Sequence, residues 1–408
     1  MNSKGKIVND PVFGFINIPQ GFIYDIIRHP FMERLSRIRQ LGLASVVYPG
    51  AQHTRFHHSL GAMHLMSEAI AQLRIKGNEI TQEEGDAVMA CILLHDIGHG
   101  PFSHALEHTL IRNMHHEKIS LMLMEEMNVA FNGKLDLCIR IFKDEYHKHF
   151  LHQLVSGQLD MDRLDYLRRD SFFTGVVEGN IGSARIIKML NVHNDRLVVE
   201  AKGIYSIENF LMARRLMFWQ VYLHKTSLAA EKMLINTLKR AKEIAAGKGH
   251  PLNVTPALHY FLYKDVCGEN FDKEALSHFS RLDDNDIWCA IKTWAEHPDF
   301  VLSTLSAGLL NRELFKIEIS SRPIKKSRTT ELKNIFVKKF NIKTEEASYF
   351  TSSDYISSNM YNEADDSIDI IYNTGDIKDI SEASDMLNIS LLSKNIKKYY
   401  CCFLRYSK

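Results

Sequence analysis

The sequence predicts a mainly α-helical protein with small β-hairpins and a small α+β region at its C-terminal end. The 408 residues include 9 prolines and 21 glycines, so few positions interrupt helices. Apolar residues recur at helical spacing from about residue 22 onward, whereas parts of the C-terminal region alternate like strands. Hydrophobic residues make up 45% of the chain and charged residues 24%, as in soluble globular proteins. We therefore predict a helical core over 1–310 and a small α+β region over 311–408.

The first elements follow from turn residues and helical periodicity. Residues 1–20 alternate apolar and turn residues, which is typical of a short hairpin. From Phe22 the apolar residues recur at helical spacing, with Pro30 interrupting the pattern and Gly42 closing it. The residues of 58–73 continue this pattern and predict a further helix.

Two helices are expected on either side of a histidine-rich turn. Thr81 and Glu84 match a capping box before an apolar run, so a helix is expected there that ends at Gly98. Pro101 is expected to open the next helix, because the first turn of a helix does not need the N–H that proline lacks. Another helix is expected over 116–127.

The second half of the predicted core contains helices and one hairpin. A charged helix is expected over 160–170, and a hairpin over 186–201 with its turn at 193–195. A long helix is predicted over 206–246. Further helices are expected up to about Leu310, where the α+β region begins.

Charge and cysteine content narrow the classes of function. The 50 Lys+Arg nearly balance the 49 Asp+Glu, so there is no strong nucleic-acid signal. The six cysteines form no C-x-x-C pair, and a chain this long does not need a disulfide framework, which favours a reducing compartment. We find neither an apolar signal segment nor an apolar run of membrane length, so we expect a cytoplasmic protein with no membrane partner.

The strongest chemical motif is the run LHDIGHGPFSH at 94–104. His95 and Asp96 end an apolar helix, where a charged aspartate needs a partner such as a metal ion. Two ligands are too few for tight binding, so other ligands must come from elsewhere in the chain. His58 and Asp162 are candidates within the predicted site region of 50–230, although spacing alone does not select them from the other histidines and aspartates. Such a mixed site would suit a divalent transition metal, with Mn, Fe, Zn and Ni as possibilities.

A rival metal motif lies just downstream. His104 and His108 flank an H-x-x-E-H sequence, which is the signature of inverted zinc peptidases. In that interpretation the two histidines share one metal on a helix and Glu107 acts as the base. It leaves His95 and Asp96 without a function, so it is the weaker alternative.

Several stretches match one known family in the order in which that family has them. These stretches cover roughly residues 9–230 and are DPVFGFI, MERLSRIRQLG, YPGAQHTRFHHSLG, LLHDIGHGPFSH, HHEKIS, QLDMDRLDYLRRD and RRLMFWQVYLHK. The chain resembles the HD-domain phosphohydrolases and, within them, the deoxynucleoside triphosphate triphosphohydrolases, a group with a mammalian member that carries a sterile alpha motif. The resemblance implies an HD-domain helical core whose metal ligands are His58, His95, Asp96 and Asp162. It also implies Mg²⁺ bound with the nucleotide and a homo-oligomer, either a dimer or a tetramer.

The resemblance also assigns roles around the metal. The catalytic residues that it implies are His104, His116 and Glu107, the last standing where the family usually has an aspartate. The implied phosphate contacts are Arg55, His99, Arg163 and Lys225. The implied sugar and base contacts are Tyr166, Asp170, Tyr222, Gln40 and Leu41. From the residues alone, Arg163 has a second interpretation, as an ion-pair partner of Asp160 along the helix.

Departures from the family pattern leave base preference open. Arg28 and Ser36 stand where the mammalian member reads guanine at a regulatory site, so guanine-specific activation does not carry over. Leu223 stands where a glutamine is common beside the catalytic pocket.

The activity implied by the resemblance is hydrolysis of a deoxynucleoside triphosphate substrate. Water activated by the metal would attack the α-phosphorus and release a deoxynucleoside and tripolyphosphate. One alternative is a nucleoside monophosphate phosphatase or another phosphomonoesterase of the same superfamily, which would release inorganic phosphate. A second is a non-catalytic nucleotide sensor, which is disfavoured because His104 and the four metal ligands are all present.

Overall fold

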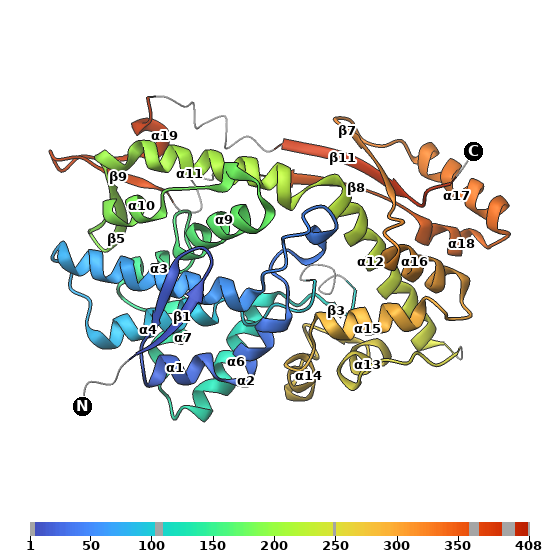
Figure 1. The fold of residues 1–408 in the computed structure, drawn as a ribbon, viewed down its shortest axis with the longest axis horizontal. Coiled ribbons are helices and arrows are strands. Elements are labelled where there is room, and N and C mark those ends of the chain that lie inside the picture. Colours follow the sequence, from blue (N-terminus) through green and yellow to red (C-terminus); the bar gives the residue numbers. More distant parts are fainter. Residues whose placement is uncertain (1–4, 103–108, 248–249, 359–366, 386–395, 407–408) are drawn as a thin grey trace.

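The computed structural model describes residues 5–102, 109–247, 250–358, 367–385 and 396–406 (Figure 1). Within these ranges helices dominate and strands form only small sheets, which confirms the predicted mainly α class. The helices up to residue 189 are α1 (Phe22–Ile27), α2 (Pro30–Arg34), α3 (Arg55–Ile75), α4 (Gln82–Leu94), α6 (His116–Ala130), α7 (Asp136–Phe142), α8 (His149–Gln153), α9 (Met161–Thr174) and α10 (Ser183–Met189). The later ones are α11 (Ile204–Met217), α12 (Lys225–Ala246), α13 (Pro256–Tyr263), α14 (Lys273–Phe279), α15 (Asp284–Trp294), α16 (Phe300–Leu310), α17 (Lys326–Phe340), α18 (Thr344–Ala347) and α19 (Ile380–Ala383).

Short helical turns and strands connect these helices. The 3₁₀ turns are η1 (Leu35–Arg37), η2 (Gly42–Val46), η3 (Val177–Gly179), η4 (Ala201–Gly203) and η6 (Ser348–Phe350), and η5 (Phe218–Tyr222) is a π-helical turn. The two-stranded pairs are β1 (Lys6–Asp10) with β2 (Gly14–Ile18) and β3 (Ile111–Arg112) with β6 (Val266–Cys267). A three-stranded antiparallel sheet has the order β7 (Lys316–Ser320), β11 (Ile396–Phe403), β8 (Thr351–Ser358). A four-stranded sheet has the order β10 (Ile377–Asp379), β9 (Asp369–Ile371), β5 (Arg196–Glu200), β4 (Leu190–His193).

The hydrophobic core is organised around α3, which packs against α4 and α9 (Figure 1). α4 is buried on nearly all sides from Ala87 to Leu94, as expected of a helix that is apolar all round. α9 buries Leu164 and Leu167 completely. Because all three helices are fixed by close packing, side chains along them have well-defined positions.

The start of α4 is as predicted. The backbone N–H of Glu84 donates to Thr81 Oγ1 at 3.1 Å, and the N–H of Thr81 donates to Glu84 Oε2 at 2.8 Å. These reciprocal bonds satisfy two of the N–H groups that a helix start leaves without partners. The prediction of a hairpin over the first twenty residues is also confirmed, since β1 and β2 pair antiparallel.

The end of α4 comes earlier than predicted. The helix ends at Leu94, and the chain then turns before Gly98. A Cβ at Gly98 would lie 2.2 Å from the carbonyl oxygen of His116, so this turn packs too closely for any other residue. The helix predicted to open at Pro101 falls largely on 103–108, outside the described residues.

The predicted continuous helix over 206–246 is wrong in its middle. α11 ends at Met217, a π-helical turn follows, and α12 begins only at Lys225. From this wide turn the Tyr222 hydroxyl donates to Asp170 Oδ2 at 2.9 Å. The apolar periodicity of the sequence continues across this break and therefore does not predict it. The π-helical turn instead accompanies the contact of Tyr222 with Asp170 on α9.

The C-terminal region contains both helices and strands, and part of it joins a sheet of the preceding region. β9 pairs parallel with β5, bringing residues 369–371 beside 198–200. β4 and β5 form the hairpin predicted around 193–195, with Asn194 and Asp195 both at positive φ, as a tight two-residue turn requires. Among the described residues, no helix combines the length and the apolar character needed to cross a bilayer.

Candidate metal centre and adjoining cavities

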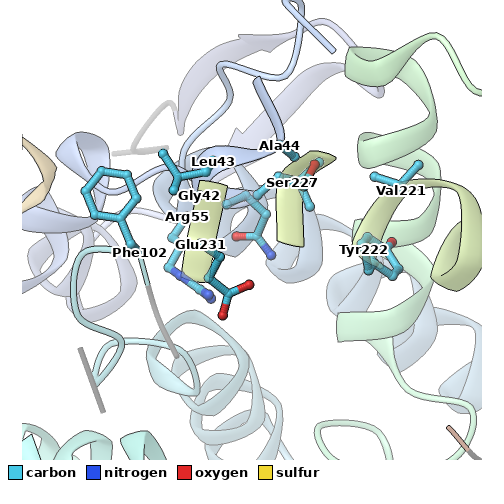
Figure 2. Close-up of a pocket in the computed structure, with 11 residues that line it drawn as sticks. Gly42, Leu43, Ala44, Arg55, Phe102, Val221, Tyr222, Ser227 and Glu231 are labelled. Atoms are coloured by element: carbon cyan, nitrogen blue, oxygen red, sulfur yellow. The ribbon is translucent and has the colours of Figure 1, made fainter. Parts of the chain in front are cut away.

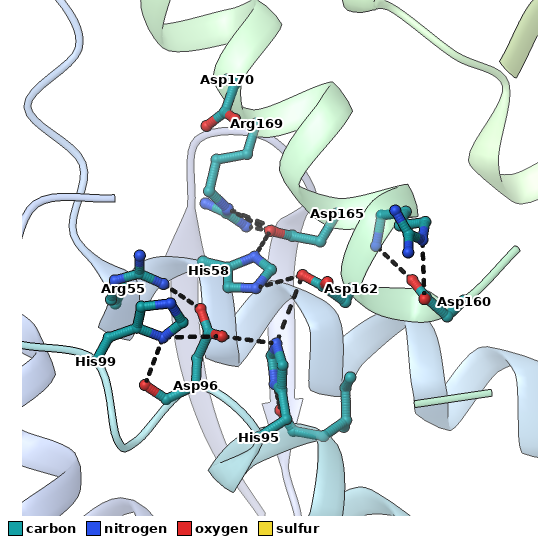
Figure 3. A network of polar contacts seen from close by, with 12 residues as sticks. Arg55, His58, His95, Asp96, His99, Asp160, Asp162, Asp165, Arg169 and Asp170 are labelled. Atoms are coloured by element: carbon teal, nitrogen blue, oxygen red, sulfur yellow. Dashed lines mark hydrogen bonds and ion pairs between the residues drawn. The ribbon is translucent and has the colours of Figure 1, made fainter. Parts of the chain in front are cut away.

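Three helices of the core bring His58, His95 and Asp162 to one point (Figure 3). The ligand atoms that these side chains offer lie within 4.8 Å of one another. Asp162 Oδ1 is 3.0 Å from His58 Nε2 and 3.5 Å from His95 Nε2. His58 is buried in the first turn of α3. His95 directly follows α4, and Asp162 lies in the first turn of α9. The structure thus brings together three of the four predicted ligands.

The hydrogen bonds of the two imidazoles use Nδ1 and leave Nε2 for a metal. His95 Nδ1 donates to the carbonyl of Ile92 at 2.7 Å, and His58 Nδ1 donates to Asp165 Oδ2 at 2.7 Å. Both Nε2 atoms are buried and have no hydrogen-bond partner in the described part of the chain. An imidazole held by its Nδ1–H directs Nε2 toward the site, where a metal binds in place of a proton, and this is the usual arrangement in protein metal sites. The donor set therefore fits a divalent cation.

The carboxylates and imidazoles of this site attract one another. Burial acts to lower the pKa of His58, but its contacts with Asp162 and Asp165 outweigh burial and raise it to about 10. Burial acts to raise the pKa of Asp162, but His58 and His95 outweigh burial and hold it far below its usual range. Asp162 is therefore ionised and attracts positive charge, as a metal ligand must.

Asp96, the fourth predicted ligand, lies beside this group and contacts His99 and Arg55 as well as His95 (Figure 3). Its Oδ1 is 3.4 Å from His95 Nε2 and 3.2 Å from His99 Nδ1, and its Oδ2 pairs with the guanidinium of Arg55. Asp96 is buried, and the neighbouring cationic groups hold its pKa well below the usual range although burial opposes them. Its role as a ligand stays a prediction.

A buried layer of charged residues, Asp165, Arg169 and Asp10, lies behind the metal ligand His58. The sequence did not predict it. Asp165 accepts from His58 through one oxygen, and Arg169 donates to both oxygens of the same carboxylate. Arg169 also donates to Asp10 Oδ2 at 2.7 Å, and all these side chains are almost fully buried. One signal was available, because Asp165 follows Asp162 by three residues and therefore lies on the same face of the helix.

Gly61 of α3 makes room for this buried layer, which leads to a prediction. A Cβ at Gly61 would lie 1.9 Å from Asp165 Oδ1 and 2.1 Å from Arg169 Nη2. We expect Gly61→Ala to destabilise the protein by about 1–3 kcal/mol, as overpacked cores do, and to weaken metal retention. Urea unfolding and metal analysis of the purified variant would measure both effects.

Gly85→Ala in α4 is the matched control for this substitution. Its Cβ would lie 3.0 Å from Arg74 Nη2 and 3.8 Å from Ile70 Cγ2, which are much looser contacts than those at Gly61. Alanine is favoured over glycine inside a helix by about 0.5–1 kcal/mol, so we expect unchanged or slightly higher stability and normal metal content. Equal behaviour of the two variants would contradict the proposed packing around Gly61.

The turn that follows His95 is held from behind by Arg34, which is fully buried. Its Nη2 donates to the carbonyls of Ile97 and His99 at 2.7 and 2.9 Å, and its Nη1 donates to the carbonyl of Leu282 at 3.0 Å. Burial lowers the pKa of Arg34 to about 9, so the side chain remains charged near neutral pH. Arg34 therefore ties the metal-site turn to the segment that precedes α15.

A first cavity has a volume of about 180 Å³, and Figure 2 shows the side chains that line it. It contains four residues that were predicted to contact the substrate, namely Gln40, Leu41, Arg55 and Tyr222. Its remaining walls are Gly42, Leu43, Ala44, Phe102, Val221, Ser227 and Glu231. Since Arg55 also pairs with Asp96, this cavity adjoins the metal centre.

The predicted sugar contact Asp170 is oriented by two neighbours. His53 Nε2 pairs with Asp170 Oδ1 at 2.7 Å, and the Tyr222 hydroxyl donates to Oδ2 at 2.9 Å. The rings of Tyr166 and Tyr222 lie 6.0 Å apart, edge to face. The structure thus brings the three predicted sugar contacts together. His53 was not singled out from the sequence, because nothing in its spacing relates it to Asp170.

A second cavity has a volume of about 270 Å³. Its lining includes His95, Asp96 and Asp162 of the metal site with His116 and Arg163, and is completed by Glu117, Phe142, His152, Val155, Ser156 and Asp160. The rings of His99 and His116 stack with 3.9 Å between their centres. The second cavity therefore opens directly onto the metal centre, whereas the first reaches it through Arg55 and its partner Asp96.

Arg163 makes the contact that the residues alone suggested, and still lines the second cavity. Its Nε donates to the carbonyl of Gly157 at 2.7 Å and lies 3.2 Å from Asp160 Oδ2. Burial and the nearby charge of Arg163 lower the pKa of Arg214, a residue that the sequence analysis did not name. The like charge of Arg163 thus disfavours the charged form of Arg214, and a bound anion would relieve this repulsion.

Some predicted residues are not placed at the site. Lys225 is exposed at the start of α12 and does not line either cavity. His104 and Glu107 lie outside the described residues, as does the H-x-x-E-H sequence. Their predicted roles stay predictions.

The chain matches known families along its central part. Residues 55–170 match the HD domain, and residues 181–253 match the HD associated region. The first range begins at Arg55 and ends at Asp170, so it contains the metal-site residues described above.

Proteins similar to this chain include both enzymes and uncharacterised proteins. A crystal structure of a phosphohydrolase from Bacteroides thetaiotaomicron has a TM-score of 0.96 and 66% identity, covering 98% of this chain and 100% of that one. The uncharacterised Bacillus subtilis protein YwfO is 30% identical over 321 residues, which are 77% of this chain and 72% of YwfO. The human deoxynucleoside triphosphate triphosphohydrolase SAMHD1 is 28% identical over 303 residues, but this chain spans only 48% of its length. By its HD domain, its HD associated region and these relatives, the chain belongs to the HD-domain phosphohydrolases.

Proposed function

We propose that the protein hydrolyses deoxynucleoside triphosphates to a deoxynucleoside and tripolyphosphate, with a divalent cation held by His58, His95 and Asp162. The observation that carries the proposal is that His95 and Asp162 line the second cavity, while Arg55, which pairs with Asp96 beside them, lines the first. The first cavity has largely apolar walls suited to a base and sugar, and the second is lined by histidines and an arginine suited to phosphates. The 28% identity to human SAMHD1 supports the same activity.

The reacting phosphate would lie at the metal centre, between Arg55 of the first cavity and the wall of the second. A divalent cation bound there would lower the pKa of the attacking water and neutralise charge on the phosphate oxygens. His58 and His95 are held ready for the cation, because Asp165 and the carbonyl of Ile92 fix their Nδ1 protons. Arg55, which lines the first cavity, would contact the phosphate nearest the sugar.

Asp170 would accept a hydrogen bond from the 3′-hydroxyl of the sugar. His53 and Tyr222 orient its carboxylate, and each carboxylate oxygen can accept more than one hydrogen bond. Tyr222 and Leu41 both line the first cavity, so they would pack against the sugar. Close approach of Leu41 would disfavour a 2′-hydroxyl, which supports a deoxynucleotide over a ribonucleotide.

The outer phosphates would lie in the second cavity. Arg163 is anchored through its Nε, so its guanidinium is held at the cavity wall, where its charge also acts on Arg214. His116 lines the same cavity and would donate to a phosphate oxygen. Asp160 and Asp162 line it too, so a further cation such as Mg²⁺ bound with the nucleotide would offset their charge against that of the phosphates.

A product assay tests this proposal. Purified protein is incubated with Mn²⁺ or Mg²⁺ and a mixture of all four deoxynucleoside triphosphates, and the products are separated by ion-exchange chromatography. We expect deoxynucleosides and tripolyphosphate in equal amounts, because attack at the α-phosphorus releases the whole triphosphate chain. Using the mixture also supplies any nucleotide that the enzyme needs as an activator.

Other products would refute the proposed reaction in different ways. Inorganic phosphate with a deoxynucleoside diphosphate would show attack at the terminal phosphorus instead. Release of phosphate from nucleoside monophosphates, with no reaction of the triphosphates, would identify a phosphomonoesterase.

A further inference from the structure

The wall of the first cavity contains two polar side-chain atoms that have no hydrogen-bond partner among the described residues. Ser227 is 7% exposed, and its Oγ has no hydrogen-bond partner among the described residues. The buried Oε1 of Gln40 has none there either. A buried polar atom without a partner costs free energy, so such atoms in a cavity wall point to a polar ligand. Both residues line the cavity, together with the carboxylate-bearing Glu231 (Figure 2).

The polar side chains of the cavity wall, whether or not they have partners in the protein, are mostly hydrogen-bond acceptors. Glu231 offers a carboxylate, which when ionised can only accept, and Gln40 has its unpartnered atom at the amide oxygen. Ser227 and Glu231 are four residues apart on α12, so they lie on one face of that helix. The remaining walls include Leu43, Phe102 and Val221, whose apolar surfaces suit the flat faces of an aromatic ring.

The position of the cavity indicates which part of a nucleotide would enter it. Arg55 and Tyr222 line the cavity, and these residues connect it to Asp96 beside the metal ligands and to Asp170. A deoxynucleoside triphosphate with its phosphates at the metal centre and its sugar at Asp170 would therefore place its base between the apolar walls. This step rests on the proposed function.

We infer that the first cavity selects the base by its hydrogen-bond donors, and that Glu231 favours guanine. The Watson–Crick edge of guanine carries two adjacent donors, N1–H and the N2 amino group, which a carboxylate can accept together. Adenine and cytosine carry one amino group beside a ring acceptor, and thymine carries one N–H between two carbonyls. Repulsion between these carbonyls and Glu231 disfavours thymine, so the expected order is guanine first, adenine and cytosine next, and thymine last.

An internal competition between substrates tests the inference. Wild-type protein and Glu231→Gln are each given an equimolar mixture of the four deoxynucleoside triphosphates, and the four deoxynucleosides are quantified at low conversion. Their ratios equal the ratios of kcat/KM and do not depend on the fraction of folded or activated enzyme. We expect wild type to form deoxyguanosine fastest, and Glu231→Gln to lower the ratio of deoxyguanosine to thymidine by about tenfold.

The control is Glu243→Gln on the same helix. Glu243 lies about 18 Å further along α12, its side chain is 58% exposed, and it interacts with Arg240 and Tyr349 rather than with the first cavity. We expect the product ratios of this variant to match those of wild type.

Two results would overturn the inference, and they are distinguishable. Product ratios that are the same in wild type and Glu231→Gln would show that Glu231 does not select the base, while the proposed activity stands. A wild-type protein that forms no deoxynucleoside and no tripolyphosphate would remove the proposed function itself, and the inference with it.

Discussion

Replacing Asp162 with alanine is expected to remove both the metal and the activity. Asp162 is the one carboxylate within reach of both His58 Nε2 and His95 Nε2 among the described residues. Without it no described carboxylate reaches both imidazoles, and the remaining ligands are too few to retain a divalent cation through purification. Loss of the cation removes several kcal/mol of transition-state stabilisation, so kcat/KM should fall by about a thousandfold or more.

Metal analysis and kinetics on the same preparation measure this effect. Metal content is determined by inductively coupled plasma mass spectrometry, and circular dichroism checks that the helices are retained. Asp265→Ala is the control, because Asp265 is 67% exposed and pairs with Arg112 at the surface. An Asp162→Ala variant with full metal content and full turnover would exclude the proposed metal centre.

Replacing Arg34 with methionine is expected to cause the largest loss of stability. The substitution keeps an unbranched side chain but removes the donors to the carbonyls of Ile97, His99 and Leu282. Each buried carbonyl left without a partner costs about 1–3 kcal/mol, and the contact of the guanidinium with the ring of Phe279 is lost as well. We expect the free energy of unfolding to fall by about 3–5 kcal/mol.

Urea unfolding of Arg34→Met and Arg37→Met compares the stability lost with a buried arginine and with an exposed one. Arg37 is 46% exposed and pairs with Asp283 at 2.6 Å, so its replacement should cost less than about 1 kcal/mol. Arg34→Met should also reduce turnover, because the carbonyls that it releases belong to the turn after His95. Equal stability of the two variants would show that the buried hydrogen bonds of Arg34 do not hold this turn.

Local rules predicted the elements that local interactions stabilise. The capping box of Thr81 and Glu84 forms as expected, because both partners lie within one turn of the same helix. The hairpin around Asn194 and Asp195 forms because these residue types tolerate positive φ. The helices around the site were predicted for the same reason, since their apolar spacing is a property of each segment alone.

Contacts between distant segments decided the features that were missed. The break between α11 and α12 lies where Tyr222 contacts Asp170 of α9. The pairing of β9 with β5 joins segments that lie more than a hundred residues apart in the sequence. No periodicity within a single segment carries information about such partners, so both features needed the assembled chain.

The candidate site shows the same division between sequence and structure. From the sequence, motif resemblance named His58, His95 and Asp162 as ligands, and their residue types alone suit a divalent cation. Only the tertiary structure showed that Asp165 and the carbonyl of Ile92 fix which imidazole nitrogen is free. A sequence specifies which chemical groups are present, whereas the direction of a lone pair depends on hydrogen bonds between helices that pack together only in the folded protein.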